Sequence, residues 1–329
     1  MSTGAAGHGA RSTVRPNGET GRPGPVRTFL RTVDGVTIDA AYDPGCLVYG
    51  HDHDHHTHDD GHGHGHHTHD DGHGHGHHTH DDGHGHGHGA YGADDTGRPP
   101  PGHLADLAIV VAHGFTGHLE RSHVRRVAGV LARYGAVVTF SFRGHGASGG
   151  LSTVGDREVD DLAVAVEWAR ELGHSRVATV GFSMGGSVVL RHAAQHREGS
   201  HTDAVVAVSS PARWFYRGTA PMRRLHWLVT RPEGRLVGRY GLRTRIHHRD
   251  WDPVPASPVE SVPLIAPTPL LVVHGDQDGY FPVDHARMLA EAARGHAELW
   301  LEPGMGHAEH ASDDGLLARI GAWAASRAG

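Results

Sequence analysis

A serine flanked by glycines stands where an apolar run gives way to a helical pattern. Residues 181–185 have the spacing G-x-S-x-G and directly follow the β-branched run at 176–180. In a sharp turn from a strand into a helix, the serine hydroxyl is held at the end of the strand, and the first amides of the helix stabilise negative charge. Neighbouring turns leave no room for β-carbons, so both flanking positions need glycine. The pattern predicts that Ser183 is a nucleophile for acyl transfer.

A second concentration of reactive side chains is a histidine-rich stretch. Residues 51–88 hold 18 of the 36 histidines, and an eleven-residue unit, HHTHDDGHGHG, occurs three times in it without a mismatch. Imidazoles interleaved with carboxylates suit Zn²⁺ or Ni²⁺, and a glycine-rich backbone lets sets of ligands assemble. Passive expansion of a tolerated loop and a pH-dependent charge effect of the histidines are the alternatives. The candidate metal ligands are His55, His56, His58, His62, His64, His66, His67 and His69.

The elements that must position Ser183 alternate along the chain. From Leu104 onward, apolar runs alternate with helical patterns, which is typical of a parallel sheet covered by helices. Upstream, two β-rich runs around Asp34-Gly35 predict an antiparallel hairpin at 26–40. The expected strands of the parallel part span residues 107–113, 136–142, 176–182, 203–209, 268–274 and 297–301. The expected helices span residues 120–134, 155–172, 184–197, 283–294 and 313–327.

Further motifs at the ends of these expected strands make the chain similar to the α/β-hydrolase superfamily. Besides the serine motif they lie at 113–117, 143–148, 275–282 and 304–307. The resemblance covers about residues 26–50 and 104–325. It implies an α/β-hydrolase fold: a mostly parallel central sheet with an N-terminal antiparallel hairpin, helices on both faces and a helical cap insertion. The core motifs most resemble the esterase, monoacylglycerol-lipase and aminopeptidase-like branch.

The resemblance implies a triad of serine, acid and histidine in that chain order. The acid is Asp278, the second aspartate of the pattern G-D-x-D-x-x-x-P, whereas Asp276 is interpreted as a turn cap. The base is His307, on the loop after the last expected strand. His310 competes for this role but lacks the glycines that let a loop bring an imidazole to the serine.

The resemblance also implies an oxyanion hole, formed by the backbone N–H groups of Phe115 and Met184. His113, at the start of the same loop, is expected to fix the loop by hydrogen bonds rather than to transfer protons. His145 is a poor catalytic candidate because its loop precedes the nucleophile in the chain.

The long segment at 211–265 is expected to form a lid or cap. It is rich in arginine, and one hypothesis is that some of these side chains attract an anionic or phosphorylated acyl substrate. The alternative is a solvated basic surface. The arginines are Arg213, Arg217, Arg223, Arg224, Arg231, Arg235, Arg239, Arg243, Arg245 and Arg249.

Composition limits the remaining possibilities. Residues 1–25 and 51–103 are polar and glycine-rich and are expected to be disordered, which leaves one hydrolase domain at 26–50 and 104–329. The formal net charge of −7 gives no reason to expect nucleic acid as a partner. No window is apolar enough for a membrane span or a signal peptide. The single cysteine, Cys46, excludes an intramolecular disulfide, so a cytoplasmic protein is expected.

These patterns together predict a serine hydrolase of carboxylesterase type. It would cleave the ester, or a related acyl bond, of a small or medium substrate through an acyl-enzyme at Ser183, with no cofactor for catalysis. A peptidase or thioesterase with the same triad is one alternative. A metal-binding or buffering protein on a weakly active hydrolase scaffold is the other. The expected partners are a small-molecule acyl substrate and, through the histidine-rich stretch, divalent metal ions; the oligomeric state stays open.

Overall fold

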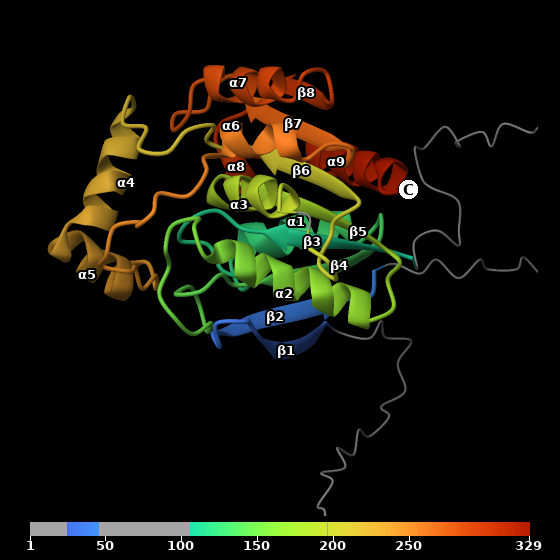
Figure 1. The fold of residues 1–329 in the computed structure, drawn as a ribbon, viewed down its shortest axis with the longest axis horizontal. Helices are drawn as coiled ribbons and strands as arrows, with labels where there is room; N and C mark the ends of the chain where they lie inside the picture. Colours follow the sequence, from blue (N-terminus) through green and yellow to red (C-terminus); the bar gives the residue numbers. More distant parts are fainter. Residues whose placement is uncertain (1–24, 46–105, 196) are drawn as a thin grey trace, which may run out of the picture.

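The computed structural model describes residues 25–45, 106–195 and 197–329, and its centre is one eight-stranded sheet (Figure 1). The order across the sheet is β1-β2-β4-β3-β5-β6-β7-β8. The expected N-terminal tail, the histidine-rich insertion and Cys46 lie outside the described residues. The strands are β1 (Val26–Arg31), β2 (Thr37–Asp43), β3 (Leu107–Ala112), β4 (Ala136–Phe140), β5 (Arg176–Phe182), β6 (Ala204–Val208), β7 (Leu270–Gly275) and β8 (Ala297–Glu302).

The sheet is parallel from β4 to β8 and antiparallel at its N-terminal edge. β1 pairs with β2, and β2 with β4, in the antiparallel sense, whereas the remaining neighbours run parallel. The hairpin closes at Gly35, whose positive φ of 80° suits the left-handed position of a tight turn. The predicted α/β-hydrolase fold, with its mostly parallel sheet and N-terminal hairpin, is confirmed.

Helices cover both faces of the sheet, as side-chain alternation along the strands requires (Figure 1). In β3, Ala108 and Val110 pack in the core beneath α2, α3, α6 and α7. Ile109 and Val111 pack on the opposite side, beneath α1 and α9. The helices are α1 (Ser122–Leu131), α2 (Glu158–Glu171), α3 (Met184–Ala193), α4 (Ala220–Thr230), α5 (Pro232–Gly241), α6 (Pro258–Ser261), the short 3₁₀ turn η1 (Val262–Leu264), α7 (Asp284–Ala292), α8 (Ala308–Ala311) and α9 (Asp314–Arg327).

The element ends differ little from the predicted ones. The largest shift is at α3, which was expected to reach residue 197 but ends at Ala193. The helix stops because the Gln195 N–H donates to the carbonyl of His192 in a tighter turn. Helical periodicity alone does not show where such a turn begins.

The segment at 211–265 divides into two parts in space. Helices α4 and α5, the cap helices from here on, pack against each other and stand away from the sheet (Figure 1). By contrast, α6 and η1 pack against α3 and α7, with Val262 and Ile265 fully buried in the core. The stretch after α5 is tied to the loop after β4 by isolated bridges, such as that between Ser152 and Ile246. That the cap helices act as a lid stays a prediction.

Candidate active site

Ser183 lies at the junction of β5 and α3 in a backbone conformation that few side chains adopt. Its φ is 51° and its ψ is −112°. Such a conformation costs on the order of 1–3 kcal/mol and persists only where the surroundings enforce it. Here the Ser183 N–H donates to the carbonyl of Val208 at the end of β6, which fixes the turn to the sheet. The hydroxyl is thereby presented at the carboxyl ends of the parallel strands.

The glycines on either side of Ser183 are required by close backbone approaches. A β-carbon at Gly181 would lie 2.2 Å from the carbonyl oxygen of Gly185. One at Gly185 would lie 2.1 Å from the carbonyl oxygen of Ala112 in β3. Because both obstacles are backbone atoms, no side-chain rotation relieves the clash. The steric reason expected for G-x-S-x-G therefore holds in this chain.

Replacing Gly185 with alanine is expected to destabilise the fold by about 2–4 kcal/mol, because strand β3 must move to admit the new methyl group. The measurement is the free energy of unfolding in urea. The matched control is Gly129→Ala in α1, where an added β-carbon meets nothing within 4 Å. That control should be neutral or stabilising by up to about 1 kcal/mol. Equal stability of the two variants would contradict the steric account.

The structure brings the three predicted triad residues together. His307 Nε2 lies 2.9 Å from Ser183 Oγ, and His307 Nδ1 lies 2.8 Å from Asp278 Oδ2. Asp278 follows β7, and His307 lies on the loop between β8 and α8. Since Nδ1–H donates to the carboxylate, the Nε2 lone pair is free to accept the serine proton. The arrangement has the connectivity of a nucleophile, a base and an orienting acid.

Both oxygens of the Asp278 carboxylate have hydrogen-bond partners. Its side chain is 0% exposed, Oδ1 accepts the N–H groups of Tyr280 and Phe281 at 2.8 and 3.0 Å, and Oδ2 faces His307. Burial raises the pKa of this carboxyl, but the hydrogen bond and charge of His307, with the two backbone donors, outweigh burial and bring the pKa below its ordinary value. Asp278 is therefore an anion at neutral pH.

Asp276, interpreted from the sequence as a turn cap, has a different contact. Its Oδ1 accepts the N–H of Gly304, 2.7 Å away on the loop that leads to His307. The side chain therefore ties the acid loop to the base loop, and does not close its own turn. The sequence could not show this contact because the partners lie 28 residues apart.

Two aromatic side chains beside Asp278 pack on the imidazole of His307. The Tyr280 ring stacks on it with centroids 4.2 Å apart and an interplanar angle of 25°, and the Phe281 ring lies 5.7 Å away. These contacts restrict the orientation of the ring. No pattern in the sequence marked either residue, although both lie between the two ends of the G-D-x-D-x-x-x-P motif.

His113 and His145 brace the loop after β3, as expected for a structural role. The Phe142 N–H donates to His113 Nε2 at 3.0 Å, so His113 Nδ1 carries the proton and donates to the Gly114 carbonyl at 2.7 Å. His145 Nε2 accepts the N–H of Thr116 at 3.3 Å. Burial lowers the pKa of His145 to about 4 and holds that of His113 well below its ordinary value. Both rings are neutral supports.

Phe115 and Met184, the predicted oxyanion donors, lie with Ser183 in the wall of one cavity. Met184 is the first residue of α3, and neither its N–H nor that of Phe115 donates a hydrogen bond to any described part of the chain. Both amides are therefore available to a ligand. His310, the competitor of His307, instead packs its ring on His123 with centroids 3.9 Å apart.

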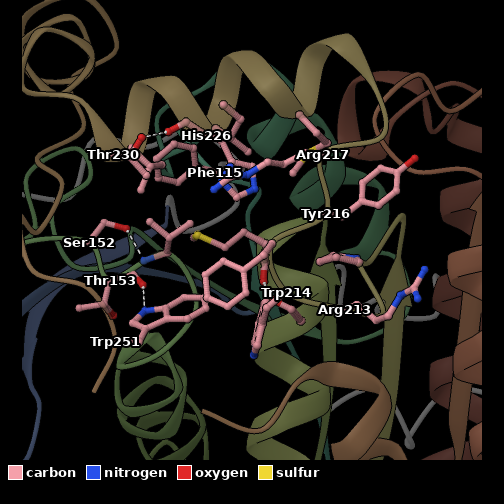
Figure 2. Close-up of a pocket in the computed structure, with 18 of the residues that line it drawn as sticks. Phe115, Ser152, Thr153, Arg213, Trp214, Tyr216, Arg217, His226, Thr230 and Trp251 are labelled. Carbon is pink, nitrogen blue, oxygen red and sulfur yellow. Dashed lines mark hydrogen bonds between the residues drawn. The ribbon is translucent and has the colours of Figure 1, made fainter. Parts of the chain in front are cut away.

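A cavity of about 470 Å³ opens at Ser183 (Figure 2). Trp214 and Trp251 both line it, and their rings pack edge to face with centroids 5.1 Å apart. Their indole N–H groups donate to the carbonyls of Pro255 and Thr153, so they present carbon surfaces to the cavity. Further apolar side chains from the 211–265 segment that line the cavity are Pro211, Phe215, Met222, Leu225, Val229 and Val254. The volume of the cavity is in the range of small-molecule binding sites.

Three arginines, Arg213, Arg217 and Arg249, also line this cavity. Within the described parts of the chain, none of the ten arginines at 211–265 forms an ion pair with a carboxylate. The cavity wall therefore combines an apolar interior with three arginines and one carboxylate, that of Asp250, which forms no ion pair with them.

Two other predictions concern metal ions and membranes. Over residues 25–45, 106–195 and 197–329, no group of three or more His, Cys, Asp or Glu side chains could hold a metal ion. The metal prediction for the histidine-rich stretch falls outside these residues and stays a prediction. Among the helices described, none is long and apolar enough to cross a membrane. The cytoplasmic location stays a prediction as well.

Comparison with known proteins gives concordant matches. Residues 109–320 match the model of the alpha/beta hydrolase family. A monoacylglycerol lipase of Mycolicibacterium smegmatis is 28% identical over 236 residues, covering 60% of this chain and 80% of the lipase. Esterase LipC of Mycobacterium tuberculosis is 33% identical over 175 residues, covering 46% of this chain and 40% of that esterase. The solved structure of the Pyrococcus furiosus esterase Pf2001 shares the fold, with a TM-score of 0.59, 20% identity and 93% of each chain covered.

Proposed function

The chain belongs to the alpha/beta hydrolase family, and from that starting point we propose that it hydrolyses carboxylic esters through an acyl-enzyme at Ser183. The observation that carries the proposal is the continuous hydrogen-bonded series from Asp278 through His307 to Ser183 Oγ. The names of the two mycobacterial relatives, a lipase and an esterase, favour esters over other acyl compounds. No cofactor takes part in the proposed reaction.

In the proposed acylation, Ser183 Oγ attacks the acyl carbonyl while His307 Nε2 takes its proton. The anionic Asp278 keeps the remaining proton on Nδ1 and stabilises the imidazolium that forms. The oxygen of the attacked carbonyl becomes an oxyanion, which the free N–H groups of Phe115 and Met184 stabilise. Each such donor typically contributes about 3 kcal/mol. The tetrahedral intermediate then collapses, and the alcohol leaves with the proton from His307.

Deacylation repeats the same steps with water as the nucleophile. His307 takes a proton from a water molecule, which attacks the acyl-serine carbonyl. Collapse releases the carboxylic acid and returns the proton to Ser183 Oγ. The stacked Tyr280 ring keeps the imidazole in one orientation through both halves of the cycle.

The volume and the lining of the cavity support a proposal about the size and polarity of the substrate. About 470 Å³ suits a small or medium ester, and the carbon faces of Trp214 and Trp251 suit an apolar acyl or alcohol group. Phe115 contributes a bulky side chain to the cavity wall, which favours a small or medium substrate.

The proposal is tested by labelling with a fluorophosphonate probe alongside turnover of p-nitrophenyl esters of graded chain length. Parallel assays with the thioester and the anilide of the same acyl group distinguish an esterase from the two alternatives with the same triad. We expect the ester to have the highest kcat/KM, because two of the relatives are named a lipase and an esterase. Faster anilide or thioester turnover would replace the proposal by a peptidase or a thioesterase.

We also propose that Arg213, Arg217 and Arg249 attract anionic esters to the cavity. Opposite charges near an entrance raise the association rate by about 10- to 1000-fold, and salt removes the effect. The kcat/KM for a hemiester that carries a free carboxylate is therefore expected to fall about tenfold between about 0.01 M and about 1 M salt, with a neutral ester changing less than about twofold.

Replacing the three arginines with glutamine should remove the salt dependence for the anionic ester. The control is Arg327→Gln at the end of α9, on the far side of the sheet from the cap helices (Figure 1). An unchanged salt dependence in the triple variant would leave the solvated basic surface as the correct interpretation.

A further inference from the structure

Glu309 is a buried carboxylate next to the candidate active site. The proposed reaction does not use this side chain. It lies in α8, two residues after His307, and is 4% exposed. Its Oε1 accepts the N–H of Gly114 at 3.1 Å, across 195 positions of the chain. Both of its carboxylate oxygens lie 3.2 Å from where a β-carbon of Gly114 would stand, and Ser183 Cβ lies 3.5 Å from the same point. Gly114 is thus enclosed between the nucleophile and Glu309.

The position of Gly114 matters because it sets the direction of an oxyanion donor. The Gly114 carbonyl and the Phe115 N–H belong to one planar trans peptide, so fixing the carbonyl fixes the N–H on the opposite side. His113 Nδ1–H and the Gly117 N–H hold that carbonyl at 2.7 and 3.0 Å. Glu309 holds the preceding peptide through its N–H. The two peptide planes that meet at the Gly114 Cα are therefore both restrained.

The surroundings of Glu309 offer it little compensation for burial. Among the described residues, the Gly114 N–H is the one hydrogen-bond donor to its carboxylate, and His123 Nε2 is 3.8 Å away. Burial and the neighbouring His310 lower the pKa of His123, so that ring is neutral at neutral pH. Arg126 donates to the backbone carbonyl of Glu309 and not to its carboxylate. A buried carboxylate with so few partners costs free energy, which favours a role for its single strong contact.

We propose that Glu309 is a positioning residue that aligns the oxyanion donor of Phe115 with the base. Because Glu309 and His307 are two residues apart, the short segment 307–309 holds the imidazole at Ser183 and the loop of Gly114 at the same time. A shift of this segment would move both together, which keeps their relative geometry. This inference rests on the proposed ester hydrolysis, since the Phe115 N–H acts on the oxyanion of that reaction.

Three substitutions of Glu309 distinguish the effect of its hydrogen bond from the effects of its charge and its volume. Glu309→Gln keeps an acceptor oxygen within reach of Gly114, Glu309→Leu keeps the volume without an acceptor, and Glu309→Asp keeps the charge but shortens the side chain. In the Leu and Asp variants, kcat for a p-nitrophenyl ester is expected to fall about 10- to 100-fold, with KM within about threefold. The Gln variant should stay within about threefold of the wild type, because Gln supplies the acceptor.

One further measurement and a control variant make the test independent of turnover and of folding defects. Amide hydrogen exchange over 113–117 should be about tenfold faster in the Leu and Asp variants, but not in the Gln variant. The control is Glu298→Leu, which breaks an exposed ion pair with Arg327 and should change neither measurement. Should the Leu variant prove unstable, the Asp variant carries the same comparison.

Unchanged exchange and unchanged kcat in the Leu and Asp variants would overturn the positioning role. A Gln variant that loses as much activity as the Leu variant would also overturn it, since charge would then be the operative property. Failure of the proposed function looks different: the wild type itself would neither turn over esters nor bind the fluorophosphonate probe, while the exchange measurement would still report whether Glu309 holds the loop.

Discussion

Ser183→Ala is expected to lower kcat for p-nitrophenyl esters by about 10⁶-fold and to abolish fluorophosphonate labelling. The alanine removes Ser183 Oγ, the atom proposed to attack the acyl carbonyl, which lies 2.9 Å from His307 Nε2. The fold should be retained, because Oγ makes no hydrogen bond other than that to His307 within the described residues. KM, where measurable, should change little, since the cavity walls stay in place.

The control for this variant is Ser187→Ala, one turn later in α3. Ser187 Oγ donates to the carbonyl of Met184 at 2.7 Å, and its loss should leave labelling unchanged. Residual turnover of Ser183→Ala above about 1% of the wild type would show that a group other than Ser183 attacks the ester. The histidine-rich stretch would then deserve testing by deletion of residues 51–88 in the presence and absence of zinc.

Asp278→Asn is expected to lower kcat by about 10⁴-fold while leaving the fold intact. Asp278 Oδ1 accepts two backbone N–H groups, so the asparagine carbonyl should take that position and turn its NH₂ group toward His307. His307 Nδ1 must then accept a hydrogen bond, which moves the ring proton to Nε2. With Nε2 protonated, the imidazole cannot take the proton of Ser183.

The matched control is Asp276→Asn, two residues earlier, where the asparagine oxygen can still accept the N–H of Gly304. Its kcat should stay within about threefold of the wild type. Equal losses in the two variants would mean that loop structure, and not the tautomer of His307, accounts for the effect. The free energies of unfolding of both variants in urea check that neither loses stability.

The sequence predicts much of the fold because the core elements carry strong local patterns. Strands β3 to β7 are short apolar runs, and a glycine-containing motif follows every strand from β3 to β8 except β6. The carboxyl ends of parallel strands meet at one edge of a sheet. That rule alone places Ser183, Asp278 and His307 near one another. Among 36 histidines, location after the last strand left His307 and His310, and the glycines before His307 favoured it over His310.

Features that depend on packing between distant segments could not be predicted. The contact of Glu309 with Gly114 spans 195 positions, and that of Trp251 with Thr153 spans 98. Neither leaves a periodic pattern, because a single contact imposes no repeat on the sequence. The bounds of the cap helices also escaped prediction, since Gly234 and Gly238 interrupt the helical propensity of α5.

The long sequence separation of the triad has a consequence for how the protein acquires its activity. The Ser183–His307 hydrogen bond spans 124 positions, and the Asp278–His307 bond joins segments that follow two different strands. Contacts between residues so far apart in the sequence form slowly. They also depend on prior pairing of β5 with β6, β6 with β7 and β7 with β8. A newly made or refolding chain is therefore expected to lack the proposed triad until strands β5 to β8 have paired. If Ser183 acts as proposed, fluorophosphonate labelling during refolding should therefore appear only in chains in which these strands have paired.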